Sequence, residues 1–399
     1  LKAFLSGASW IAACLLTLWT VPGGEALGAT LLASFTLFLS FRMVSLRTTL
    51  DAAFEVDLEM RTPAAYAIAS ECFGAACLLL ALWRQWSIPY LVAVQAFAYL
   101  PGFLLLARAS FRRLRPAFAF DAALWGKLLR MSLPVGLANL FIIAYSRSDI
   151  LMLGWMSAGA SVGLYAAAHK LTGSLGLFPS SVTASLLPLM AEAHGAGDRD
   201  RVGRMYRGAF SAMTAAGFPL AVGGSLLAPG IVRLVYGQAY APAAGALRVL
   251  IWAALFNFAL YVLTTTALAV GRERLFTAYA GLLVLLNVVL NALLIPRYDF
   301  VGVSWATFIA EGLLMAAGVA VLRREVGLPD GAAALRSAGA AAAAGALLVW
   351  LPAPLAVRLT VAGGLYATFL YWGRGLSPEG LSALRSLFRL RAGSAPGER

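Results

Sequence analysis

Residues 140–156 read LFIIAYSRSDILMLGWM, an apolar run in which Arg147 and Asp149 stand two positions apart. About 17–25 apolar residues are long enough to cross the hydrocarbon of a bilayer as a helix. Runs of this kind recur from one end of the 399-residue chain to the other. They are continuous rather than alternating, which excludes a transmembrane β-barrel. The pattern therefore predicts an all-α polytopic membrane protein.

The composition agrees with this class. Hydrophobic residues make up 61% of the chain and charged residues only 12%, whereas a soluble domain carries about 25% charged residues. Three cysteines, Cys14, Cys72 and Cys77, lie in apolar runs without metal-ligand spacing, and we interpret them as small buried hydrophobic residues. The sequence has no nucleotide-binding loop, metal-binding motif or nucleophile motif. We therefore expect no enzyme activity and no cofactor.

Hydropathy and the turn residues between apolar runs divide the chain into about twelve predicted transmembrane spans. The spans lie at approximately 4–20, 27–47, 64–83, 88–107, 128–153, 162–188, 206–228, 243–268, 273–295, 301–322, 334–351 and 353–372.

The basic residues orient these spans. With a cytoplasmic N-terminus, 24 Lys and Arg residues fall on the cytoplasmic side, and only Arg84, Arg233, Arg297 and Arg358 fall on the opposite side. Cytoplasmic loops of membrane proteins are enriched in Lys and Arg, so both termini are predicted to be cytoplasmic. This placement also accounts for most of the net charge of +13 without a nucleic-acid partner. The basic segment 377–391 is predicted to lie along the lipid surface as an amphipathic helix, with a solvated tail as the alternative.

An ionisable side chain within a span costs roughly 2.5–3.5 kcal/mol on insertion scales, so it normally faces a partner or a water-filled cavity. In the fifth span, Asn139 and Ser146 fall on nearly one line at 100° per residue. Arg147 and Asp149 project about 80° to either side of Asn139. This wide polar face favours a helix that lines a cavity. The alternatives are an Arg147–Asp149 ion pair and an Arg147 side chain that reaches the outer headgroups.

In the sixth span, Lys170 lies too deep to reach the headgroups easily, which favours a second cation that faces the cavity. His169 beside it is interpreted first as a hydrogen-bonded polar residue without a functional role. Glu71 in the third span and Glu311 in the tenth are candidates for proton or cation coupling, with pairing to an internal base as an equal alternative.

Two further sets of polar residues recur at helical spacing. Both are interpreted as sources of hydrogen bonds between helices. The sets are Asn257, Tyr261 and Thr265 in the eighth span, and Asn287 and Asn291 in the ninth.

Three ordered segments carry a resemblance to a known family. Residues 133–192 read LPVGLANLFIIAYSRSDILMLGWMSAGASVGLYAAAHKLTGSLGLFPSSVTASLLPLMAE, and the series continues through VRLVYGQAYAPAAGALRVL at 232–250 and an asparagine-rich span within 268–307. The series resembles bacterial polysaccharide flippases of the Wzx (RfbX) type, in the superfamily that also holds multidrug extrusion antiporters and lipid II flippases. It covers about 133–322, while the match of 1–130 is looser and rests on span order and a basic loop at 108–115.

The resemblance implies two six-helix lobes around a central cavity, often with two further helices, fourteen in all. It divides this chain into an N-terminal lobe at 1–115 with four spans, a C-terminal lobe at 125–322 with six, two extra helices at 334–372, and a basic tail at 373–399. Only four spans precede the opening helix of the second lobe, so two N-terminal helices of the family fold are expected to be missing. The sequence begins with Leu1 rather than Met, which agrees with that expectation.

The resemblance also implies a function. Such proteins move undecaprenyl-diphosphate-linked oligosaccharides across the bacterial cytoplasmic (inner) membrane by alternating access, for surface polysaccharides such as the O-antigen of lipopolysaccharide. Arg147 and Lys170 are then expected to contact phosphate or sugar, Asp149 to orient Arg147 or contact sugar hydroxyls, and Asn139 to share their polar face. The implied partners are the lipid-linked oligosaccharide, membrane lipids, a polysaccharide polymerase and glycosyltransferases, with no nucleic acid.

Two other functions share much of this pattern. One is a small-molecule or ion antiporter of the multidrug extrusion type. Its substrates are usually cationic, so two deep cations in neighbouring spans disfavour it. The other is a membrane subunit of a polysaccharide-synthesising complex that transports nothing.

Overall fold

The structure is a computed structural model that describes residues 61–86, 97–114, 126–127, 147–157, 159–352 and 354–372, with isolated positions at 38–54 and 90–94. Asn139, Ser146, the first span and most of the second, and the tail at 373–399 lie outside the described residues. Contacts divide the chain into two units, Leu1–Ala122 and Ala123–Arg399. We describe each unit by itself.

All secondary structure in the described part of the chain is helical, which confirms the predicted fold class. Six helical stretches there are long and apolar enough to cross a membrane, and Ala356–Leu370 is a shorter apolar helix. The six are Arg61–Trp83, Gly159–Gly195, Arg199–Tyr236, Ala243–Ala269, Gly281–Val326 and Gly331–Trp350.

The first unit is built on helix α3 (Arg61–Trp83) and helix α5 (Leu100–Leu114), which pack together. A Cβ added at Gly102 would lie 1.8 Å from the Ser70 Oγ, so glycine is what lets these two helices approach. In the same unit, Phe54 and Leu106 form a small buried apolar cluster. The Arg113 guanidinium lies 4.6 Å from the centre of the Phe54 ring.

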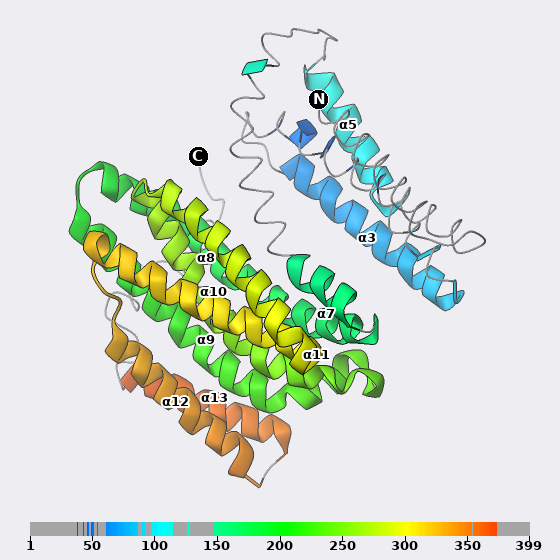
Figure 1. The fold of residues 1–399 in the computed structure, drawn as a ribbon. Coiled ribbons are helices and arrows are strands. Elements are labelled where there is room, and N and C mark those ends of the chain that lie inside the picture. Colours follow the sequence, from blue (N-terminus) through cyan, green and yellow to red (C-terminus); the bar gives the residue numbers. More distant parts are fainter. Residues whose placement is uncertain are drawn as a thin grey trace, which may run out of the picture. The chain divides into compact units, whose positions relative to one another are not determined.

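The second unit places α10 at its centre (Figure 1). This helix packs against α7, α8, α9 and α11, while α12 packs on α9 and α13 at the edge of the unit. The apolar residues of α10 explain its position, because most of them are buried. The helices are α7 (Gly159–Ser174), α8 (Leu177–Gly195), α9 (Arg199–Tyr236), α10 (Ala243–Ala269), α11 (Glu273–Val326), α12 (Gly331–Trp350) and α13 (Leu355–Trp372), with residues 147–156 helical before α7.

Helix α11 is a hairpin of two helices rather than one rod. Asp299 has a φ of 51° and a ψ of −137°, outside the helical region. A Cβ added at Gly302 would lie 2.4 Å from the Leu294 carbonyl oxygen, whereas eight residues of straight helix separate two positions by about 12 Å. The chain therefore reverses at Asp299, and its two halves correspond to the predicted spans 273–295 and 301–322.

The Asp299 carboxylate holds this turn against the neighbouring loop. It accepts hydrogen bonds from the hydroxyls of Ser157 and Ser161, which flank the start of α7. The turn of the α11 hairpin and the entry into α7 therefore meet at one end of the unit.

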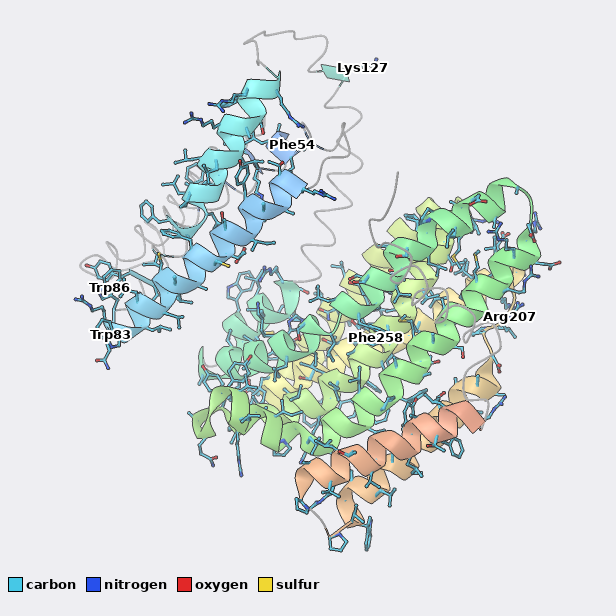
Figure 2. The ribbon with its side chains drawn as sticks, turned by 180° about the vertical axis from the view of Figure 1, so that it is seen from behind. Phe54, Trp83, Trp86, Lys127, Arg207 and Phe258 are labelled. Carbon is cyan, nitrogen blue, oxygen red and sulfur yellow. The ribbon has the colours of Figure 1, made fainter. Side chains whose placement is uncertain are left out.

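The opposite end of the unit carries the basic loops. Arg272, just before α11, donates a hydrogen bond to Glu325 in the last turn of the same hairpin. Arg201 lies 3.8 Å from Glu192 across the α8–α9 turn, and Arg207 donates to the Val326 carbonyl at 3.5 Å. Figure 2 shows Arg207 at this end of the bundle and Phe258 in its interior. Three loops predicted to share the cytoplasmic side are thus adjacent in space.

Candidate functional site

Asp149 lies at the centre of a buried polar cluster. The residue is 7% exposed, and its carboxylate accepts hydrogen bonds from the Tyr165 hydroxyl at 2.7 Å, the Asn291 amide at 2.8 Å and the Thr307 hydroxyl at 3.2 Å. Burial of a charge is costly unless it is well hydrogen-bonded. These three donors, from α7 and both halves of α11, satisfy the Asp149 carboxylate within the bundle.

The α11 hairpin explains why two of these donors meet at Asp149. Asn291 precedes the turn residue Asp299 by eight positions and Thr307 follows it by eight, so they lie at the same height on the two antiparallel halves. Asn287 lies one turn from Asn291 and accepts hydrogen bonds from the Asn291 amide at 2.9 Å and from the Ser148 hydroxyl at 3.0 Å. The cluster therefore ties the helix at 147–156 to the hairpin.

The atoms of this cluster that could bind a cation are all oxygens. A carboxylate, amide carbonyls and hydroxyls are the ligands that hard cations prefer in proteins. Within the described residues, no group of three or more His, Cys, Asp or Glu side chains is arranged to hold a metal ion. Any cation at Asp149 would therefore be held by one charge and neutral oxygens.

Arg147 lies on a different side of its helix from Asp149. It is exposed, whereas Ser148 and Asp149 are buried. Both charged residues are near enough to His169 on α7 to interact with it electrostatically. The carboxylate of Asp149 is directed to α7 and α11, and no Arg147–Asp149 ion pair is found in the part of the chain that the structure describes.

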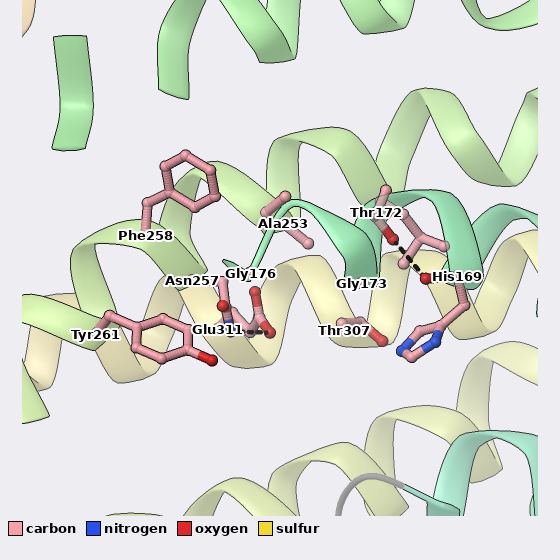
Figure 3. A pocket seen from close by; sticks show the side chains of 12 residues that line it. His169, Thr172, Gly173, Gly176, Ala253, Asn257, Phe258, Tyr261, Thr307 and Glu311 are labelled. Carbon is pink, nitrogen blue, oxygen red and sulfur yellow. Dashed lines mark hydrogen bonds between the residues drawn. The ribbon is translucent and has the colours of Figure 1, made fainter. Parts of the chain in front are cut away.

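A second polar site surrounds Glu311. A pocket of about 140 Å³, open on one side, is formed between α7, the start of α8, α10 and the second half of α11. Glu311 is 6% exposed, and its carboxylate accepts a hydrogen bond from the Asn257 amide at 3.2 Å. Figure 3 shows this bond and the surrounding side chains. The lining comprises His169, Thr172, Gly173, Gly176, Leu250, Ala253, Ala254, Asn257, Phe258, Tyr261, Thr307 and Glu311.

Glycines form the wall of this pocket where α7 ends and α8 begins. A Cβ added at Gly173 would meet no atom within 4 Å, so the backbone here borders open space. At Gly176 an added Cβ would lie 3.3 Å from the Gly173 carbonyl oxygen and 3.7 Å from the Tyr261 hydroxyl. Small residues at the break thus keep the pocket open beside Tyr261.

Thr307 connects the two sites. Its hydroxyl donates to Asp149, and the residue also lines the pocket of Glu311. Positions 307 and 311 are four apart in a helix and therefore lie on one face. A buried cluster and an open pocket are in this way built on adjacent turns of one helix.

The structure distributes the predicted site residues unequally. Glu311 and the less favoured His169 line the pocket, whereas Lys170 is exposed on α7 and does not. Glu71 is exposed on α3 of the first unit. The interpretation of the asparagines as sources of interhelical hydrogen bonds is confirmed for Asn257, which binds α11, and for Asn291, which binds Asp149.

Two residues of the sites were missed from the sequence. Tyr165 lies one turn before His169 in a run of small apolar residues, and Thr307 lies one turn before Glu311. A search for hydroxyls at i−4 from polar residues within spans would have found both. Their partner Asp149 could not be assigned, because its contacts are 16 and 158 residues away in the chain.

The helices and buried ionisable groups define a multi-pass membrane protein, and comparisons with known proteins give its relatives. The family described as "Polysaccharide biosynthesis protein" matches residues 4–194, and the MatE family matches residues 134–293. A curated protein named "Probable flippase AglR", from Haloferax volcanii, is 25% identical over 183 residues. That alignment covers 44% of this chain and 38% of AglR, so this chain matches less than half of the length of its relative.

A solved structure has the same fold. Lipid II flippase MurJ in an inward closed conformation superposes with a TM-score of 0.78 at 14% sequence identity, covering 92% of this chain and 80% of the MurJ chain. The chain is thus similar in sequence to two transporter families and to a flippase, and it shares the fold of a second flippase.

Proposed function

We propose that the protein is a flippase that moves undecaprenyl-diphosphate-linked oligosaccharides from the cytoplasmic to the outer leaflet of the bacterial inner membrane, for surface polysaccharide synthesis. The observation that carries the proposal is the match of the polysaccharide biosynthesis family to residues 4–194, with the likeness to AglR as support. Both termini would lie in the cytoplasm, on the side of the adjacent basic loops.

Exposed cations within the spans support a substrate with a charged head. Arg147 and Lys170 are both exposed on the second unit, and charges at this depth are unfavourable against lipid. A pyrophosphate would compensate them, and the planar guanidinium of Arg147 suits bidentate phosphate binding. The lipid tail would stay in the bilayer while the two lobes rock to alternate access. Asn139 would share the polar face of Arg147, and Asp149 would hold the helix of Arg147 in place through its hydrogen bonds to α7 and α11.

Coupling to an ion gradient is a further part of the proposal. The sequence named Glu71 and Glu311 as candidate carboxylates, and Asp149 is a third because it is buried among neutral polar groups. Replacement of Na⁺ by K⁺, and collapse of the pH gradient, would each be applied to vesicles that carry the protein. A rate that responds to neither treatment would contradict coupling to these ions.

The experiment is complementation of a strain from which the full-length gene has been deleted. The wild-type gene should restore surface polysaccharide and remove the accumulated lipid-linked precursor. Arg147→Ala and Lys170→Ala should each restore less than about a tenth, because a charge-assisted phosphate contact is worth about 1.5–3 kcal/mol. Arg147→Lys keeps the positive charge but lacks the planar guanidinium that can bind phosphate through two N–H groups. As a control, Arg233→Ala removes an exposed arginine elsewhere in the second unit. Normal polysaccharide from both alanine variants would contradict the assignment of these two residues.

One observation favours a second function. The MatE family matches residues 134–293, which include the buried carboxylate Asp149. An antiporter would export small cations such as the dye ethidium. Dye efflux that depends on the wild-type gene, without any change in surface polysaccharide, would favour the antiporter over the flippase.

A further inference from the structure

We propose that the pocket around Glu311 is a saccharide subsite, in which Glu311, Asn257, His169 and Tyr261 recognise the hydroxyl groups of one sugar unit of the lipid-linked substrate. This inference rests on the proposed function, because it concerns the head group of the same substrate. It assigns to Glu311 the recognition of an uncharged group rather than the binding of an ion.

The size and opening of the pocket favour a group larger than an ion. The volume of about 140 Å³ is several times the roughly 30 Å³ that one water molecule occupies in the liquid. The pocket is partly open rather than enclosed, which suits the entry of a head group. A bare cation would be better held by a closed shell of ligands.

The chemistry of the lining also favours hydroxyl groups. The Glu311 carboxylate accepts hydrogen bonds, the Asn257 amide both donates and accepts, and the Tyr261 hydroxyl and His169 ring can do either. Sugar hydroxyls likewise donate and accept, so neighbouring hydroxyls can satisfy such a mixed set. A cation would instead be repelled by the N–H and O–H donors that lie among the acceptors.

The position in the bundle suits a head group that crosses the membrane. Glu311 follows the turn at Asp299 by twelve residues, which corresponds to about 18 Å of helix. The hydrocarbon core is about 30 Å thick, so with the Asp299 turn at one face of the membrane, as the predicted span 301–322 requires, the pocket would lie near its middle. A polar site there offers hydrogen bonds where lipid offers none.

The arrangement also makes the pocket a specificity determinant. A site built to hydrogen-bond a hydroxyl discriminates strongly against an analogue that lacks it, since its buried polar groups are then left unpaired. Glu311 is buried and fixed by Asn257, so it has little freedom to find another partner. A saccharide lacking the matching hydroxyl would bind more weakly.

The test compares two lipids on the purified full-length protein. One probe is the lipid-linked saccharide extracted from the deletion strain, and the other is undecaprenyl diphosphate without sugar. Glu311→Gln replaces the carboxylate by an amide of nearly the same shape. Gly173→Leu fills the pocket from a position whose added Cβ meets nothing within 4 Å. Gly163→Leu is the matched control, because Gly163 lies on the same helix, has equal space and is not part of the lining.

Wild-type protein should bind the saccharide lipid at least about tenfold more tightly than the sugar-free lipid, since a hydrogen bond to a charged group contributes about 1.5–3 kcal/mol. Glu311→Gln and Gly173→Leu should each abolish most of that difference and leave the sugar-free lipid unaffected. Gly163→Leu should behave as the wild type.

Three outcomes would overturn the inference. Unchanged binding of the saccharide lipid by both pocket variants would exclude the subsite. An equal loss of both lipids, reproduced in the wild type by removal of Na⁺ or by acid, would make Glu311 a coupling residue. If the wild type binds neither lipid, the proposed function itself fails and the subsite with it.

Discussion

The Asp149 cluster and the Glu311 pocket are two solutions to the burial of one carboxylate in a membrane bundle. Asp149 is enclosed, and three donors from α7 and α11 satisfy it. Glu311 is held by Asn257 but borders an open pocket. Both sites include the same face of α11, through Thr307 and Glu311. The comparison indicates that the closed site stabilises the fold, while the open one is available to a ligand.

The largest effect should follow from breaking the closed site. Asp149→Leu leaves the Tyr165, Asn291 and Thr307 donors without their acceptor, at about 1–3 kcal/mol each. We expect a loss of at least about 3 kcal/mol in the free energy of unfolding, measured in mixed micelles. Glu311→Leu should cost about 1 kcal/mol, because Asn257 can turn to water in the open pocket. Equal losses from the two substitutions would remove the distinction between the sites.

The hairpin that brings Asn291 and Thr307 together should be nearly as sensitive. Gly302→Ala would place its Cβ 2.4 Å from a backbone oxygen, and overpacking of this kind costs about 1–3 kcal/mol. A fixed carbonyl cannot move aside as a side chain can, so we expect the upper end of this range. The control is Gly281→Ala, in the first half of α11, where an added Cβ has nothing within 4 Å. This substitution should be neutral or slightly stabilising. If Gly302→Ala leaves the free energy of unfolding unchanged, the two halves of α11 are not closely packed.

A smaller effect should follow from the removal of one donor of the closed site. Tyr165→Phe deletes the hydroxyl that lies 2.7 Å from Asp149, and hydrogen bonds to charged groups contribute about 1.5–3 kcal/mol. We expect about 1.5 kcal/mol of destabilisation with normal binding of the saccharide lipid at the Glu311 pocket. If the variant keeps full stability but loses the saccharide lipid, Tyr165 would belong to the ligand site instead.

The smallest effect is expected at the basic end of the unit. Arg272 donates a hydrogen bond to Glu325, which lowers the pKa of that carboxylate below its ordinary value. A lowered carboxylate pKa contributes stability that is present above the unfolded-state pKa and is lost as the pH falls through the folded-state pKa. The pair is partly exposed, so Arg272→Ala should cost less than about 1 kcal/mol at neutral pH. Thermal unfolding of both proteins across acidic pH should show that difference disappear, and a constant difference would contradict the pairing.

The fold class could be predicted from the sequence because continuous apolar runs are sufficient evidence for membrane helices. The hairpin at 273–295 and 301–322 was also predictable, since Pro296 and Arg297 interrupt the apolar pattern. Only part of the closed site around Asp149 could be predicted from the sequence. Helical spacing identified Asn287 and Asn291, but their partners Ser148 and Asp149 lie about 140 residues earlier, and only the assembled bundle brings them together.

The contrast between Lys170 and His169 shows a further limit of sequence patterns. Depth within a span favoured Lys170 as the residue that faces a cavity, and His169 was ranked below it. Neighbouring positions on a helix differ by about 100°, so only one of them can face the Glu311 pocket, and packing of α7 against α10 selects His169. The predicted roles of Arg147 and Lys170 toward a phosphate remain predictions.

The most direct test of the flippase proposal is translocation in vesicles that contain the purified full-length protein. The lipid-linked saccharide from the deletion strain would be incorporated on both sides, and a sugar-oxidising reagent that cannot cross the membrane would report the outer fraction over time. Protein-containing vesicles should expose nearly all of the saccharide lipid to the reagent, and protein-free vesicles only about half. Exposure of half in both would contradict the proposal.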